Sequence, residues 1–151
     1  MEEEDLQQAC IFCGIANGKV PSKKIYEDYV CTAVLDINPA ASGHVLIIPK
    51  KHYQITPQVP DNELVKITSV AKTISVSMLK ALKAEGSTIF LANGGVAGQR
   101  APHVMMHVIP RFLNDGLDIL KIPEQNVPDE RLNESGQLLL NLIQKKLGEN
   151  K

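Results

Sequence analysis

The sequence predicts an α+β domain in which an antiparallel sheet is packed against one long helix and followed by a C-terminal helix. Two patterns predict this fold. Several short segments rich in apolar and β-branched residues are separated by turn residues, as in strands. One longer segment repeats its apolar residues at the three- and four-residue spacing of a helix. Strands with segregated helices are typical of the α+β class, and 151 residues fit a single domain, 1–151, with one core.

The first half of the chain predicts three strands. Glycines and a proline before residue 24 favour a short helical turn followed by a loop. Residues 24–27 and 30–36 are apolar and β-branched on either side of Asp28, which predicts a hairpin. Residues 44–48 predict a further strand that is closed by Pro49.

A long amphipathic helix is predicted over residues 61–84. Its apolar side chains share one face, and Asp61 could cap its start while Gly86 could end it. Residues 88–93 then predict a buried strand, and residues 103–109 predict the last strand after a loop rich in glycine.

The C-terminal helix is predicted over about residues 128–147. Its apolar residues again recur at helical spacing. They are Leu132, Leu139, Leu142, Ile143 and Leu147.

Composition argues against several classes of partner and location. The net charge is −1 and there is no basic run, so extended nucleic acid is not an expected partner. The acidic N-terminus lacks the features of a secretory signal, and no apolar run approaches the length of a membrane span, so we expect a cytoplasmic protein. Three cysteines suit metal binding or burial better than a disulfide framework.

The segment 103–107 contains the residues best suited to catalysis or ligand binding. In an extended strand His103, Met105 and His107 share one face, and the residues between them share the other. The preceding loop, 92–99, contains glycines that let backbone N–H groups approach an anion. Either feature alone is more often structural than functional.

Together these features resemble the signature of the histidine-triad (HIT) superfamily. The loop Gly-Gly-Val-Ala-Gly-Gln followed by His-x-x-x-His-x-Ile-Pro-Arg is similar to the family pattern His-x-His-x-His. Earlier segments are similar to other family motifs in the expected order, and the resemblance extends from about Cys10 to Arg111. Those segments are 11–12, 35–39 and 43–52.

The resemblance implies a homodimer that binds a purine nucleoside phosphate, in a family of nucleotidyl hydrolases and transferases that act on phosphoramidates or dinucleoside polyphosphates. It implies that Asp36 accepts hydrogen bonds from the ribose hydroxyls and that His107 hydrogen-bonds a phosphate oxygen. Gln99 and the loop amides, including that of Gly98, would face the phosphate. The apolar slot for base and sugar would consist of Ile11, Phe12, Val34, Ile37 and Leu46.

Each of these residues also has a structural interpretation. Asp36 could organise the turn before Pro39, and the apolar residues could belong to the core. We assign His44 and Cys31 to structural roles. Many relatives have an amide side chain near the ribose or phosphate at the position of Ala92. Here Asn93 follows one position later, and we expect it to supply this contact if the loop shifts register.

The pattern departs from the family at its middle position. Family members use the middle histidine as a nucleophile on the α-phosphate, and here that residue is Met105. A thioether cannot take this role, and Met106 points to the opposite face. Two interpretations follow: a nucleotide-binding module without nucleotidyl transfer, which we favour, or a slow hydrolase in which water attacks directly. A dimeric scaffold that binds no nucleotide, and a redox protein using the cysteine pair, are further alternatives.

A structural zinc site is also implied. Cys10 and Cys13 have the spacing with which two thiolates hold one metal ion. By resemblance to zinc-bearing family members, His52 and His103 would complete a four-coordinate Cys2His2 site. Such a site has no open position and would be structural.

Overall fold

A computed structural model describes residues 9–118 and 123–149 of the chain. The chain divides into two compact units, Met1–Leu117 and Asp118–Lys151, and each is described by itself. The predicted sheet and long helix belong to the first unit, and the predicted C-terminal helix belongs to the second.

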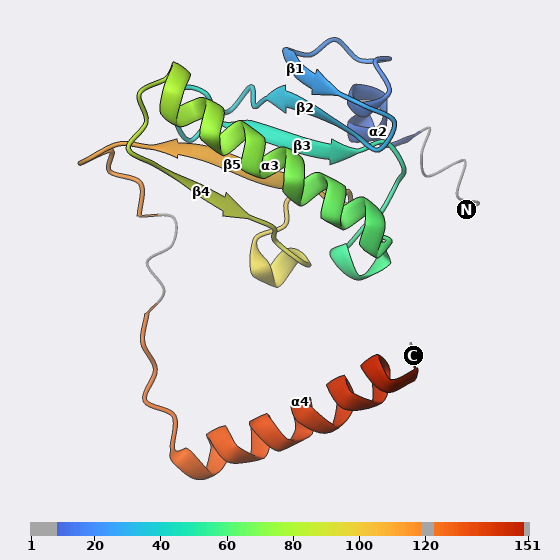
Figure 1. Ribbon diagram of the computed structural model, residues 1–151, viewed down its shortest axis with the longest axis vertical. Helices are drawn as coiled ribbons and strands as arrows, with labels where there is room; N and C mark the ends of the chain where they lie inside the picture. Colours follow the sequence, from blue (N-terminus) through green and yellow to red (C-terminus); the bar gives the residue numbers. More distant parts are fainter. Residues whose placement is uncertain (1–8, 119–122, 150–151) are drawn as a thin grey trace. The chain divides into compact units, whose positions relative to one another are not determined.

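The first unit is built on a five-stranded sheet with the order β1-β2-β3-β5-β4 (Figure 1). Every neighbouring pair of strands is antiparallel, so the α+β class and the antiparallel sheet are confirmed. The strands are β1 (Lys24–Glu27), β2 (Cys31–Leu35), β3 (Val45–Pro49), β4 (Gly86–Phe90) and β5 (Met106–Arg111).

Helices cover the two faces of this sheet unequally. The long helix α3 (Asp61–Ala81) packs on β3, β4 and β5, while the short helix α2 (Ile11–Ala16) packs on β2 and β3. Alternate residues of a strand point to opposite faces. Ala33 and Ile47 pack in the cluster that contains α3, and their neighbours Val34 and Leu46 pack against α2. The two helices therefore lie on opposite faces.

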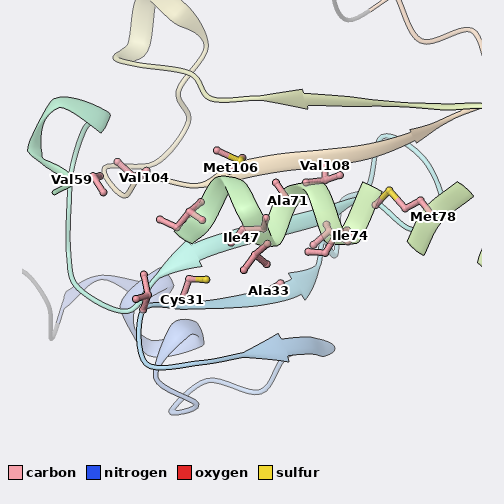
Figure 2. Packing of buried hydrophobic residues seen from close by; sticks show 14 of the residues in the cluster. Cys31, Ala33, Ile47, Val59, Ala71, Ile74, Met78, Val104, Met106 and Val108 are labelled. Carbon is pink, nitrogen blue, oxygen red and sulfur yellow. The ribbon is translucent and has the colours of Figure 1, made fainter. Parts of the chain in front are cut away.

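The main core lies between α3 and the sheet (Figure 2). Ile67, Ala71 and Ile74 point from the helix toward buried residues of β2, β3 and β5. Cys31 is fully buried in this cluster, as its position in an apolar strand predicts. Burial raises the pKa of its thiol to about 12, which suits an inert core residue.

The ends of α3 differ from the prediction. Pro60 is the N-cap residue and Asp61 is the first helical residue, so the Asp61 side chain does not cap the helix. The helix ends at Ala81, and Lys83 adopts a left-handed conformation with φ of 58°. Gly86 is therefore not the helix stop; it is the first residue of β4.

The last two strands are also shifted from the predicted ranges. Strand β4 spans Gly86–Phe90 where 88–93 was predicted, and β5 spans Met106–Arg111 where 103–109 was predicted. His103 and Met105 thus precede the hydrogen-bonded part of β5. The later start of β5 accompanies the contacts that His103 makes with other partners, described below.

The second unit contains helix α4 (Asp129–Glu149), close to the predicted range of 128–147. Asp129 and Glu130 lie in its first turn, where their negative charges interact favourably with the helix dipole. The predicted apolar residues of this helix are all exposed. Among the described residues, no helix combines the length and apolar character needed to cross a membrane. The single-domain assignment of the whole chain stays a prediction.

Candidate functional site

The site lies on the face of the sheet opposite α3. Across this face the strand register aligns Val34, Leu46, His107 and Phe90 on four neighbouring strands. Val34 and Leu46 are buried beneath α2. The short helix contacts β2 and β3, and His107 on β5 is partly exposed.

His107 is held by two ring contacts. Its imidazole stacks on the Phe90 ring with the centroids 4.4 Å apart and an interplanar angle of 5°. Its Nδ1 atom lies 3.0 Å from Nε2 of His44. Burial, with a smaller contribution from His44, lowers the pKa of His107 to about 4. The ring is therefore neutral at physiological pH.

Met105 lies on the same side of the chain as His107 and packs against the second apolar cluster, beside Phe12 and Ile15. Val104 and Met106, the residues on either side of it, are buried in the main core with α3. The alternation predicted for this segment is therefore confirmed. A thioether offers no exchangeable proton and is only a weak hydrogen-bond acceptor.

Asp36 uses one carboxylate oxygen in its own turn. Oδ1 accepts a hydrogen bond from the Asn38 amide at 2.9 Å, which is the structural role that the sequence also allowed. Oδ2 lies 3.6 Å from Nδ1 of His44, beyond hydrogen-bond distance. One oxygen of the carboxylate is thus left for another donor.

The five apolar residues predicted to form the base and sugar slot divide into two groups. Val34 and Leu46 are buried beneath α2, and Phe12 is partly buried in the same cluster. Ile11 and Ile37 are 60% and 85% exposed. Both side chains are thus more than half exposed.

The glycine-bearing loop is fixed by two amide side chains. Gln99 accepts from the Gly94 amide at 2.7 Å and donates to the carbonyls of Gln54 and Ala101 at 2.6 and 2.8 Å. Asn93 accepts from the Thr56 amide at 2.9 Å. The polar groups of Gln99 are thus occupied within the chain. The amide of Gly98, which was expected to face the phosphate, donates instead to the Gly95 carbonyl at 3.0 Å, and the Gln99 amide donates to the Gly94 carbonyl at 3.2 Å. Gly98, with φ of 86°, needs the conformational freedom of glycine.

A hollow of about 300 Å³ adjoins this loop. Arg100, Gln99 and Gly95 line one side of it, and Gln54 and Ile55 line another. The positive charge of Arg100 also acts on His107, where it helps to lower the pKa of the imidazole. Arg100 has no ion pair within the described residues, so its charge is available to an anion near His107.

A second cluster combines the two cysteines with His52 and His103, and its four ligand atoms all lie within 4.8 Å of one another. Nδ1 of His103 lies 3.5 Å from both sulfur atoms, and Nδ1 of His52 lies 3.3 Å from the sulfur of Cys13. In a tetrahedral zinc site, bond lengths of about 2.3 Å to sulfur and 2.0–2.1 Å to nitrogen separate sulfur and nitrogen by roughly 3.5 Å. The donor set and its spacing therefore fit zinc.

The tautomer of His103 supports the same conclusion. Its Nε2 lies 3.1 Å from the carbonyl oxygen of Pro49, which can only accept a hydrogen bond, so Nε2 carries the proton. Nδ1 then directs its lone pair toward the thiols, as in a metal-binding histidine with a backbone acceptor behind it. Burial lowers the pKa of His103 to about 4, so the ring is a neutral ligand.

The Cys13 thiol ionises with difficulty when no cation is beside it. Burial, together with the adjacent Cys10, raises the pKa of Cys13 to about 12. A bound cation removes this barrier because thiolates are stable as its ligands. This property suits a metal site better than a reactive redox pair.

Two residues of the site were missed by the sequence analysis. His44 was assigned to structure, but it hydrogen-bonds His107 across 63 positions of sequence, so that assignment was incomplete. Arg100 was not selected, although an arginine directly after the glycine-bearing loop is a signal for anion binding. Nothing in the local sequence around His44 could have identified its partner.

Comparison with known proteins finds a family model and relatives that all point to the same family. The model of the HIT domain family matches residues 17–114. An uncharacterized HIT-like protein of Methanocaldococcus jannaschii is 48% identical over 128 residues, which cover 83% of this chain and 97% of that protein. The adenosine 5'-monophosphoramidase of Saccharomyces cerevisiae is 36% identical over 135 residues, which cover 89% of this chain and 83% of the yeast protein.

A solved structure resembles the fold as a whole. The zinc-bound histidine triad family protein of Mycobacterium smegmatis superposes with a TM-score of 0.67 and 31% identity, and the match covers 96% of this chain and 99% of that one.

Proposed function

Since the chain belongs to the HIT family, we propose that it binds a purine nucleoside phosphate beside His107 and does not carry out covalent nucleotidyl transfer. One observation carries this proposal. By resemblance to the family pattern Met105 stands where the nucleophile is expected, and it lies next to a neutral His107 whose ring is held in place by His44 and Phe90. His107 can bind an anion, whereas Met105 offers no group that can attack phosphorus and then lose a proton.

The proposed ligand contacts follow from the free groups of the site. The phosphate accepts a hydrogen bond from His107, and Arg100 supplies positive charge. The free carboxylate oxygen of Asp36 accepts from a ribose hydroxyl. Base and sugar pack on Phe12 and on the exposed Ile11 and Ile37. A relative that is an adenosine 5'-monophosphoramidase supports an adenosine phosphate as the ligand.

The loss of the covalent step follows from the chemistry of sulfur in a thioether. Attack by Met105 on phosphorus would leave a sulfonium cation, which has no proton to lose. Met106 cannot replace it, because its side chain is buried in the main core on the other face. We therefore expect binding without a nucleotidyl-protein intermediate.

The test compares the natural protein with Met105→His. Calorimetric titration with adenosine monophosphate measures binding, and mass spectrometry after mixing with adenosine phosphoramidate detects a nucleotidyl adduct. We expect both proteins to bind, and the adduct and rapid turnover to arise in Met105→His alone. Turnover by the natural protein without an adduct would instead support direct attack by water. An adduct on the natural protein, or the absence of binding, would refute the proposal.

We further propose that Cys10, Cys13, His52 and His103 hold a structural zinc ion. A zinc-bound relative with the same fold supports this metal. When bound, zinc would link α2 to His52, and also to His103, which lies just before β5. The homodimer and the cytoplasmic location stay predictions.

A further inference from the structure

A chain of three hydrogen-bonding groups leads from the backbone to the candidate site. The amide nitrogen of Ala40 lies 3.1 Å from Nδ1 of His44, and Nε2 of His44 lies 3.0 Å from Nδ1 of His107. His44 is buried. Because His44 lies between a backbone amide and His107, the donor and the acceptor of each hydrogen bond can be assigned.

The amide of Ala40 fixes the first direction. A backbone N–H can only donate, so Nδ1 of His44 must accept and carries no proton. Burial lowers the pKa of His44, so its ring is neutral and its one proton is on Nε2. That proton can only be donated to Nδ1 of His107. His107, which is also neutral, then carries its proton on Nε2.

Asp36 does not reverse this order. Its Oδ2 atom is the other acidic oxygen near Nδ1 of His44, but the distance of 3.6 Å is too long for a hydrogen bond. A proton on Nδ1 would also face the N–H of Ala40 at 3.1 Å, and the amide would lose its acceptor. The arrangement with Nε2 protonated satisfies both His44 nitrogens.

We infer that His44 is a positioning residue that fixes His107 as the tautomer with its proton on Nε2. The stack on Phe90 fixes the ring plane, and Nε2 of His107 has no hydrogen-bond partner among the described residues. His107 is therefore a permanent donor that is directed away from His44. With no lone pair on the free nitrogen, His107 cannot act as a base or nucleophile in place of Met105.

Nuclear magnetic resonance of protein with ¹⁵N-labelled histidine tests the tautomers without any ligand. At pH 7 we expect the rings of His44 and His107 both to be protonated on Nε2, with a scalar coupling between Nε2 of His44 and Nδ1 of His107. A proton on Nδ1 of His107, or averaged signals from its two nitrogens, would overturn the inference.

Two substitutions distinguish the hydrogen bond donated by His44 from the space that its side chain fills. In His44→Gln the side-chain amide keeps a donor near the original Nε2, whereas His44→Leu fills the space with no polar group. We expect averaged nitrogen signals for His107 in His44→Leu, and an affinity for adenosine monophosphate lower by about threefold or more. His44→Gln should keep the natural tautomer and most of the affinity. Natural nitrogen signals in His44→Leu would show that His44 does not fix the tautomer.

The ligand measurement rests on the proposed function, but the resonance measurement does not. If adenosine monophosphate fails to bind while both tautomers are as expected, the proposed function is wrong and the positioning role stands. If the nucleotide binds and His107 is protonated on Nδ1, the positioning role is wrong and the proposed function stands. Thermal unfolding of each variant verifies that the fold is retained.

Discussion

At the scale of single residues, the chemistry of the site depends on which nitrogen or sulfur atom has a free lone pair or a free proton. Met105 has no proton to exchange, and the N–H of His107 is on Nε2, the nitrogen that does not contact His44. The same reasoning applies to His103, where the Pro49 carbonyl takes the Nε2 proton and leaves Nδ1 as a ligand. The Pro49 carbonyl thus defines the role of His103, and the Ala40 amide defines that of His107 through His44.

Arg100 provides a prediction at this scale. Its exposed guanidinium acts on His107 and has no ion-pair partner in the described chain. We expect Arg100→Gln to weaken binding of adenosine monophosphate roughly two- to fivefold, as for an exposed charge that interacts across water, and more so at low salt. Calorimetric titration at two salt concentrations measures the effect.

Lys72→Gln is the matched control for this prediction. It removes the same charge from α3, which lies on the opposite face of the sheet. Equal losses of affinity in the two variants would mean that net charge, and not the position of Arg100, attracts the phosphate.

At the scale of elements, Asp28 closes the turn between β1 and β2. One carboxylate oxygen accepts from the amides of Val30 and Cys31, and the other accepts from the Tyr26 hydroxyl and pairs with Lys66. Burial alone would raise the pKa of Asp28, but these hydrogen bonds outweigh it and lower the pKa to about 2. The ionised form is therefore favoured by folding.

The expected pH dependence follows from the sign of that shift. A lowered pKa in the folded state stabilises the protein above the unfolded pKa of about 3.9, and this contribution is lost as the pH falls toward 2. We expect Asp28→Asn to lower the free energy of unfolding by about 1–2 kcal/mol at pH 6. Denaturation at pH 6 and at pH near 2 measures the difference. A loss that stays the same at both pH values would contradict this account.

Helix α3 supports a second element-scale prediction. Ile67 is fully buried against the sheet, so Ile67→Ala should cost about 2–5 kcal/mol of unfolding free energy. Val65 lies on the same helix with 69% of its surface exposed, and Val65→Ala should change stability by less than about 0.5 kcal/mol. Urea unfolding of both variants measures the two values. Similar losses would show that the buried face is assigned wrongly.

The sequence predicted the elements better than their ends. Spacing of apolar residues is a local property, so it located both long helices and every strand. The start of β5 depends instead on His103, which is turned toward Cys10, Cys13 and the Pro49 carbonyl, groups at least 54 positions away. The partnership of His44 with His107 is equally non-local. Such contacts exist only after the sheet has formed.

At the scale of the whole molecule, the two candidate sites are neighbours along one segment. Residues 103–107 contribute a ligand to the metal cluster at one end and the proposed phosphate donor at the other. Met105 lies between them against α2. Because α2 begins next to Cys10, an ion in the cluster would also hold this helix against the sheet.

Removal of zinc tests this coupling. Four ligands from three distant segments, 10–13, 52 and 103, would be joined by one ion, so folding and metal binding are linked. We expect about one zinc per chain after extensive dialysis, and a clear fall in thermal stability when a chelator removes it. Cys10→Ser should lose the zinc, whereas Cys31→Ala should retain it, because Cys31 belongs to the main core. Less than half an equivalent of bound zinc in the natural protein, or unchanged unfolding after chelation, would contradict a structural role. Loss of the metal from Cys31→Ala would show that zinc content follows general stability and not the cluster itself.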